Sequence, residues 1–377
     1  MQAWKKDRLV EGLRLTAGAA CLPAICLAAY LSLPLLGPAL EQAALLSAVL
    51  SFPAEEDTLP EPEEQEAPSA PAELEDAEVM APPPSYDYLE KLTPVEKEAP
   101  AAPIEVPVKP ENAGSIQRRT YTTGNGSAYI PLEAGYIKNC TTLDTASILE
   151  AVAQRPAFAI QGDGTPEVLI MHTHATESYQ AMALDWYDKA DSARTTDLTK
   201  NTCAVGEVIA RQLEAGGIGV LHDTTLHDYP SYTGAYERSA ATVKAYLEKY
   251  PSIKVVLDVH RDAIQTDSST MVAPVTSIGG KSCAQVMIIS GCDDGRFNMP
   301  NYMENLKFSA ALQAQIETDY PTLTRPILFD YRKYNQDLTT GSILLEVGGH
   351  ANTLEEALNC GEFVGKSLAK VLLALKE

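Results

Sequence analysis

Basic side chains are scarce in this chain. Its 377 residues include 29 Lys and Arg against 51 Asp and Glu, which gives a net charge of −22. Nucleic acids and anionic membrane surfaces bind clustered Lys and Arg, so neither is an expected partner. The overall balance of 45% apolar and 21% charged residues excludes a collagen, a coiled coil, a wholly disordered chain and a polytopic membrane protein.

Cysteine and histidine are also sparse. Two of the seven cysteines lie in one apolar stretch near the N-terminus, and the other five are scattered without a CxxC spacing. Neither a disulfide framework nor a cysteine zinc site is therefore expected. The chain contains only six histidines, which makes their positions informative.

The N-terminus has the pattern of a membrane anchor. Residues 1–14 carry four basic side chains, and residues 15–40 contain no charge at all. A spanning helix needs about 20 apolar residues, and basic residues before the span keep the N-terminus in the cytoplasm. A cleaved signal peptide is the alternative, although its apolar core is usually shorter. We expect a single-pass transmembrane anchor over 15–40 and an extracytoplasmic remainder.

Residues 41–114 are predicted to form a flexible linker. Within them, residues 53–110 contain 13 Pro, 16 Asp or Glu and only three Lys. Such a segment cannot bury a core, and its charges repel one another. The expected result is an extended tether that holds the following domain away from the membrane.

Residues 115–377 are predicted to form one α/β domain. Strand-like apolar runs alternate with helical patterns, which favours a mostly parallel sheet with helices on both faces. The expected strands cover 168–171, 218–221, 253–259, 284–290 and 342–347. The expected helices cover 202–213, 233–249, 301–318 and 353–375, the last with a Thr353–Glu356 capping box.

Chemically active side chains follow three of the expected strands. His172, His174 and Glu177 follow the first of them, and His260-Arg261-Asp262 follows another. Glu346 lies near the end of a third, within an apolar run where a charge needs a physical reason. Ligands of parallel sheets bind at the carboxyl ends of the strands, so these residues form the candidate site.

A catalytic zinc ion usually takes three N or O ligands from the protein, and two imidazoles and a carboxylate match that requirement. The HxxE spacing of His174 and Glu177 lets one turn bring both groups to a single ion, with His260 as the third ligand. His172 is the alternative first ligand. Glu346, outside the ligand set, is the candidate general base.

Other polar residues near these strand ends are assigned supporting roles. Asp262 and Arg261 are candidate polar anchors, and Arg261 is also a candidate to stabilise an oxyanion. His222 and His227 are interpreted as parts of a polar turn, and His350 as a loop residue.

Four motifs resemble the stage II sporulation protein P family. They are VLIMHTHATESY, HDTTLHDYPSYTGAYERS, IKVVLDVHRDAI and YNQDLTTGSILLEVGGHANTLEEA. The resemblance implies a zinc-dependent N-acetylmuramoyl-L-alanine amidase that degrades peptidoglycan, in some members with endopeptidase activity. It also implies forespore engulfment together with the stage II sporulation proteins D and M. The implied location is the space between the forespore and mother-cell membranes.

The resemblance implies a fold similar to the zinc exopeptidases and common bacterial amidases. If the roles of the residues in those enzymes are carried over, the zinc-ligand positions fall on His174, Glu177 and His260. The catalytic position falls on Glu346. Asn335 and Gln336, in the YNQDL segment, are expected in the substrate groove together with Asp262. The extra His172 departs from the pattern, as does the lack of an acidic, Gly-rich run around the first His.

Two other functions compete with the amidase. One is a stem-peptide endopeptidase or carboxypeptidase with the same metal site. The other is a non-catalytic peptidoglycan-binding scaffold, which would have no use for a general base. A nuclease is disfavoured by the charge of −10 on residues 111–377.

Overall fold

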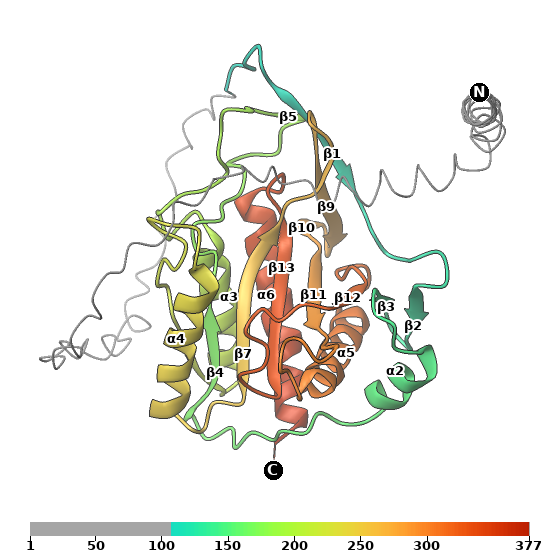
Figure 1. Ribbon diagram of the computed structural model, residues 1–377. Helices are drawn as coiled ribbons and strands as arrows, with labels where there is room; N and C mark the ends of the chain where they lie inside the picture. Colours follow the sequence, from blue (N-terminus) through green and yellow to red (C-terminus); the bar gives the residue numbers. More distant parts are fainter. Residues whose placement is uncertain (1–106, 377) are drawn as a thin grey trace, which may run out of the picture. The chain divides into compact units, whose positions relative to one another are not determined.

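The computed structural model describes residues 107–376 (Figure 1). The predicted anchor over 15–40 and most of the predicted linker lie outside these residues. Within 107–376, no helix is long and apolar enough to cross a membrane.

An eight-stranded sheet forms the centre of the domain, in the order β2-β3-β12-β11-β13-β7-β4-β6. Its strands are β2 (Tyr129–Pro131), β3 (Tyr136–Asn139), β4 (Pro166–Met171), β6 (Gly219–His222), β7 (Val255–Asp262), β11 (Val286–Gly291), β12 (Ile327–Asp330) and β13 (Gly341–Gly349). All five strands expected from the apolar runs are present, with bounds shifted by at most three residues.

The sheet is mixed, so the prediction of a mostly parallel sheet is wrong. β13, β7, β4 and β6 run in one direction, whereas β11, β12 and β3 run in the other. Parallel neighbours need a crossover connection, usually a helix. Between β7 and β11 the chain instead forms the strands β8 (Gln265–Asp267), β9 (Thr270–Ile278) and β10 (Lys281–Ala284), and β11 enters antiparallel to β13.

Helices cover both faces of the sheet, as expected. They are α2 (Thr145–Val152), α3 (Thr202–Ala215), α4 (Ala235–Lys249), α5 (Tyr302–Asp319) and α6 (Leu354–Ala374). Side chains alternate along β4: Ile170 faces the main core with α3, α5 and α6, whereas Leu169 and Met171 face α4. Figure 1 shows α4 in front of the sheet and α3 and α6 behind it. The capping box of Thr353 and Glu356 is confirmed.

A second, smaller sheet was not expected from the sequence. Its strands are β1 (Gly114–Arg119), β5 (Trp186–Tyr187), β8 (Gln265–Asp267), β9 (Thr270–Ile278) and β10 (Lys281–Ala284). Ile116, Tyr187 and Met271 form its small apolar core with Ala351, which follows β13. Figure 1 places β1, β5 and β9 beyond the carboxyl ends of β7 and β13. The small sheet therefore borders the edge at which the candidate site lies.

Residues between the linker and β4 also pack into the domain. Ile130, Ile137 and Ile148 are fully or almost fully buried in the main core. β3 extends the large sheet by pairing with β12, and β1 extends the small sheet by pairing with β9.

Candidate metal centre

The carboxyl ends of three neighbouring parallel strands carry the candidate site. Met171 of β4 pairs in register with Asp258 of β7, and His260 of β7 pairs with Glu346 of β13. Residues in register on neighbouring strands point to the same face of a sheet. Asp258, His260 and Glu346 therefore all point to the face that α4 covers.

A tight turn after β4 brings His174 and Glu177 into the same place. The Glu177 N–H donates to the His174 carbonyl at 3.1 Å, and His174 Nδ1 lies 3.6 Å from Glu177 Oε1. His260 Nδ1 lies 3.5 Å from Glu177 Oε2. One potential ligand atom from each of the three residues lies within 4.8 Å of the other two, and all three residues are buried. Sequence spacing and strand geometry thus converge on one cluster.

His172 is directed away from this cluster. Its Nδ1 lies 2.8 Å from the Val259 carbonyl, and its Nε2 lies 2.9 Å from Nε2 of His222. A Cβ on Gly206 of α3 would meet both imidazoles, so His172 faces α3. β4 ends at Met171, and the turn then separates His172 from His174. Burial, with His222 nearby, lowers the pKa of His172 to about 3.

Asp258 contacts His260, the third potential ligand, on the side of the ring that faces away from Glu177. Its Oδ1 lies 2.7 Å from Nε2 of His260, the ring nitrogen that faces away from Glu177. It also accepts hydrogen bonds from the N–H and hydroxyl of Thr173. Burial opposes the charged form of His260, yet the carboxylates of Asp258 and Glu177 hold its pKa well above the usual range. Carboxylates in this position commonly orient metal-binding imidazoles.

Glu177 is held as a carboxylate by several donors. The backbone N–H of Arg261 donates to Oε2 at 3.1 Å, and Nη2 of Arg194 lies 3.6 Å from Oε1. Burial alone would raise the pKa of Glu177. The contacts with His174 and His260 and the charge of Arg261 nevertheless hold it well below its usual range.

The donor set fits a metal ion. Two imidazole nitrogens and one ionised carboxylate oxygen converge, and Asp258 and the backbone of Arg261 orient two of the three ligands. Ligands of this chemistry suit zinc among the common protein metals.

Aromatic rings enclose His174. The ring of Tyr232 stacks on the imidazole at a centroid distance of 4.6 Å, and Tyr236 meets it edge-on at 5.4 Å. The Arg194 guanidinium lies over the Tyr232 ring, 5.0 Å from the ring centroid. Because Tyr232 is exposed, this stack forms part of the rim of the site.

Glu346 lies beside the cluster, and although the residue as a whole is partly exposed, its Oε2 is buried. Its Oε2 has no hydrogen-bond partner among the described residues. Burial, together with the Asp262 carboxylate, raises the pKa of Glu346 to about 8. An unpartnered carboxyl group next to potential ligands is placed to exchange a proton with a molecule bound there.

Arg261 and Asp262 have partners within the protein. The Arg261 guanidinium donates to the carbonyls of Ser178 and Ala193, at 3.2 and 2.9 Å. Asp262 Oδ2 pairs with Nη1 of Arg325 at 2.8 Å. These contacts favour a role for Arg261 in positioning Glu177 and its loop. They do not favour the predicted contact of Arg261 with an oxyanion.

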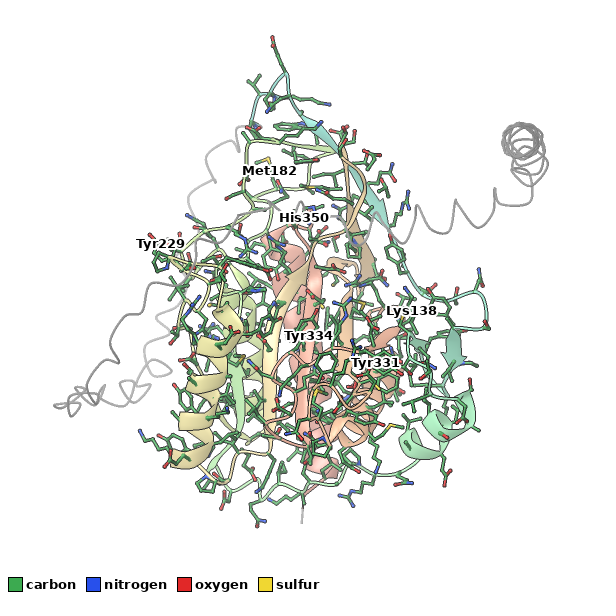
Figure 2. All side chains as sticks on the ribbon, viewed as in Figure 1. Lys138, Met182, Tyr229, Tyr331, Tyr334 and His350 are labelled. Carbon is green, nitrogen blue, oxygen red and sulfur yellow. The ribbon has the colours of Figure 1, made fainter. Side chains whose placement is uncertain are left out.

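The two polar residues of the YNQDL segment differ in their surroundings. Gln336 is 1% exposed, and its amide bonds to the backbone of Gly291 and Ile289. This contradicts a role in contacting substrate. Asn335 is partly exposed and donates from Nδ2 to the Tyr236 carbonyl and the Ser239 hydroxyl. Its amide therefore ties the loop to α4. Figure 2 shows neighbouring Tyr334 in front of the sheet and His350 near its carboxyl edge.

The remaining histidines lie outside the ligand cluster. His222 ends β6 and faces His172, and His227 lies 3.4 Å from Asp223. His350 follows β13 and is 3% exposed. Its Nδ1 lies 3.4 Å from the Asp262 carbonyl.

Three residues of the site escaped the sequence reasoning. Asp258 interrupts an apolar strand just as Glu346 does, so the same signal identifies it. Arg194 and Tyr232 come from loops without a local pattern, and only the fold brings them to Glu177 and His174.

Comparison with known proteins defines the family. The family described as Stage II sporulation protein P (SpoIIP) matches residues 85–372. The chain belongs to the stage II sporulation protein P family. The stage II sporulation protein P of Bacillus subtilis (strain 168) is 33% identical over 202 residues, which cover 50% of this chain and 47% of that protein. The match thus spans about half the length of that relative.

Two solved structures share a limited similarity with this SpoIIP family member. The N-acetylmuramoyl-L-alanine amidase AmiC2 of Nostoc punctiforme is 11% identical, with a TM-score of 0.32 over 55% of this chain and 96% of that one. The CwlD amidase of Clostridioides difficile, solved in complex with the GerS lipoprotein, is 10% identical. Its TM-score is 0.34 over 55% of this chain and 98% of its own. Similarity at this level does not establish a shared activity.

Proposed function

We propose that this chain is a zinc-dependent peptidoglycan hydrolase that cleaves the amide between N-acetylmuramic acid and the L-Ala of the stem peptide. The observation that carries the proposal is the convergence of His174, Glu177 and His260 beside the unpartnered Glu346. Membership of the stage II sporulation protein P family supports action on peptidoglycan during sporulation.

In this proposal His174, Glu177 and His260 hold the zinc ion. A bound zinc ion supplies Lewis acidity to a water molecule and to a carbonyl oxygen. Asp258 keeps the His260 ring in its binding orientation, and the Arg261 N–H does the same for Glu177. Tyr232 restricts the His174 ring by stacking on it.

Glu346 is the proposed general base. It takes a proton from the attacking water, whose oxygen adds to the lactyl carbonyl carbon of muramic acid. When the carbon–nitrogen bond breaks, Glu346 returns the proton to the departing L-Ala amine. In the metal-free protein Glu346 is protonated up to about pH 8. The positive charge of a bound zinc ion would favour its carboxylate form, which can then accept a proton from water.

The test is a product analysis with the full-length chain. It is incubated with purified peptidoglycan, with and without a chelator, and released products are identified by mass spectrometry. Free stem peptides that begin at L-Ala, lost with chelator and restored by zinc, are expected. Shortened peptides still joined to muramic acid would instead identify an endopeptidase or carboxypeptidase. Sedimentation of the protein with peptidoglycan, without any product, would favour a scaffold.

We also propose that residues 15–40 anchor the chain in a membrane, with the hydrolase domain on the extracytoplasmic side. The family suggests forespore engulfment, in the space between the two membranes, together with the stage II sporulation proteins D and M. Protease treatment of intact protoplasts tests the orientation. We expect the protease to digest the domain while the protoplasts stay intact. Full protection of the domain would mean that it lies on the cytoplasmic side. Purification of this chain tests the partners, because proteins D and M should co-purify with it. If both are absent from the purified sample, the association is contradicted.

A further inference from the structure

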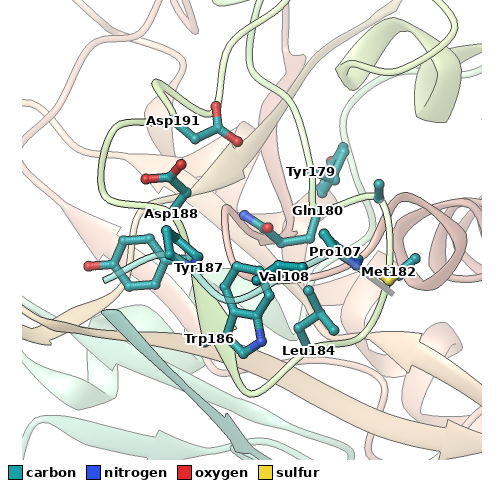
Figure 3. Close-up of a pocket in the computed structure, with 12 residues that line it drawn as sticks. Pro107, Val108, Tyr179, Gln180, Met182, Leu184, Trp186, Tyr187, Asp188 and Asp191 are labelled. Atoms are coloured by element: carbon teal, nitrogen blue, oxygen red, sulfur yellow. The ribbon is translucent and has the colours of Figure 1, made fainter. Parts of the chain in front are cut away.

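A pocket of about 400 Å³ lies along the loop that follows Glu177 (Figure 3). Its apolar lining includes the partly exposed Trp186 together with Tyr179, Met182 and Leu184. Gln180, Asp188 and Asp191 add polar groups. Binding pockets are commonly apolar with a few convergent polar groups of this kind.

The pocket is formed in part by the loop that carries Glu177. Tyr179 and Gln180 follow Glu177 by two and three residues, so they lie within about 10 Å of it along the chain. The Tyr179 hydroxyl donates to the carbonyl of Val347, the residue after Glu346, at 3.1 Å. The pocket therefore shares a loop with Glu177, and one of its lining side chains reaches β13 just past Glu346.

The wall of the pocket is held in place on both sides. Backbone bonds join Ser178 to Ala193 and Gln180 to Asn352. Tyr187 is 5% exposed within the core of the small sheet, and its strand pairs with β1 at Gly114. Since neighbouring side chains alternate along a strand, burial of Tyr187 turns Trp186 the other way.

Polar atoms of the pocket remain available. Asp188 Oδ1 and Asp191 Oδ1 accept hydrogen bonds from nearby backbone N–H groups. Within residues 107–376, neither Oδ2 has a partner, and the Trp186 indole N–H has none. Asp188 and Asp191 are the only charged side chains among the described lining residues, so the pocket is acidic.

We propose that this pocket binds the glycan of the substrate, as a neutral chain of N-acetylated hexosamines. The inference rests on the proposed function for the identity of the substrate. The apolar face of a sugar ring packs on an indole, and the ring hydroxyls donate to carboxylates such as Asp188 and Asp191. A muramic acid whose lactyl group is still an amide carries no charge, so nothing opposes its approach.

Charge argues against two other occupants. Stem peptides carry free carboxylates, and the linker of this chain has 16 acidic residues against three Lys over 53–110. The Asp188 and Asp191 carboxylates repel both. The peptide part of the substrate is therefore expected to leave the metal centre in another direction.

Tryptophan fluorescence tests the pocket without catalysis. The chain has two Trp residues, so the full-length Trp4→Phe variant reports on Trp186 alone. It is titrated, in a detergent without a sugar head group, with the tetramer of N-acetylglucosamine. A saturable fluorescence change is expected, and the double variant Asp188→Asn/Asp191→Asn should bind roughly tenfold more weakly. No change with the tetramer, or an equal change with free stem peptide or a linker peptide, overturns the proposal.

Kinetics on peptidoglycan supply the second readout. Trp186→Ala should raise KM roughly tenfold and leave both kcat and zinc content close to wild type, with Trp186→Phe between the two. Leu149→Ala, an exposed apolar residue on α2, serves as the matched control. Tetramer binding without amide cleavage would refute the proposed function and leave the glycan pocket standing. Amide cleavage with no effect of Trp186→Ala on KM would refute the pocket alone.

Discussion

Glu346 and His260 occupy the same register position on two neighbouring parallel strands, β13 and β7. This relationship fixes a candidate base beside a candidate ligand through backbone pairing rather than through a mobile loop. The pairing shifts just beyond it, between Glu346 and Gly349. The strand pairing thus positions the Glu346 carboxyl group without the help of a metal ion. The protonation of Glu346 can therefore be measured in the metal-free protein.

The raised pKa of Glu346 predicts a pH-dependent stability of the metal-free protein. The folded state holds this proton up to about pH 8, whereas an unfolded carboxyl group releases it near its ordinary pKa of 4.5. Between these values the folded state binds more protons, so its stability falls as pH rises. Glu346→Gln should therefore stabilise the metal-free protein at pH 8, by on the order of a few kcal/mol, and have little effect near pH 4.5.

Thermal unfolding with a chelator at both pH values measures this difference. Glu150→Gln, on the exposed surface of α2, is the matched control and should show no such pH dependence. An equal effect of Glu346→Gln at the two pH values would contradict the assigned protonation.

His172 and His174 are predicted to behave differently when each is replaced. His174→Gln removes a ligand atom from the cluster and should abolish tight zinc binding. His172→Gln leaves all three ligand atoms in place and should keep about one zinc per chain. It should nevertheless lower the free energy of unfolding by about 1–3 kcal/mol, because a buried hydrogen-bonded ring is lost. Zinc content by mass spectrometry shows which histidine is the ligand. Loss of zinc only from the His172 variant would mean that His172, and not His174, binds the ion.

Asp258→Asn is predicted to weaken zinc binding without removing a ligand. The amide cannot hold the His260 ring as the carboxylate does, and such supporting groups are worth roughly 10–100-fold in metal affinity. Competition with a chromophoric chelator measures the dissociation constant. Asp293→Asn, a loop carboxylate that bonds to Gly295 and Met299, is the control. An Asp258→Asn variant that binds zinc as tightly as wild type would exclude this supporting role.

Local patterns predicted most of the elements near the site. The apolar runs predicted β4, β7 and β13, and the polar residues at their ends predicted the cluster of His174, Glu177 and His260, with Glu346 in register beside His260. Strand direction was missed because an apolar run looks the same in a parallel and an antiparallel strand. The absence of a helical pattern between β7 and β11 was the available signal.

Side-chain direction at the end of β4 could not be read from spacing. If the strand had continued past Met171, His172 and His174 would have shared a face. The turn that begins there separates them, and only the packing of α3 against His172 identifies its side. Gln336 was misassigned because a family motif does not distinguish a buried amide from one that faces a substrate.

Gly206→Ala is predicted to be destabilising although it lies within a helix. Replacing Gly by Ala normally stabilises a helix by about 1 kcal/mol. Here the new Cβ would lie 2.6 Å from Nε2 of His172 and 2.7 Å from Nε2 of His222. Both imidazoles must shift, so we expect a net loss of about 1–3 kcal/mol in the free energy of unfolding. Chemical denaturation measures it, and a stabilised variant would show that His172 does not pack against α3.

The paired zinc content and turnover of Glu346→Gln test the account most directly. The substitution leaves His174, Glu177 and His260 unchanged and removes only the proposed base. We predict about one zinc per chain, as in the wild type, together with a loss of amide cleavage of at least about 100-fold. A Glu346→Gln variant that retains zinc and cleaves peptidoglycan at the wild-type rate would contradict the central claim.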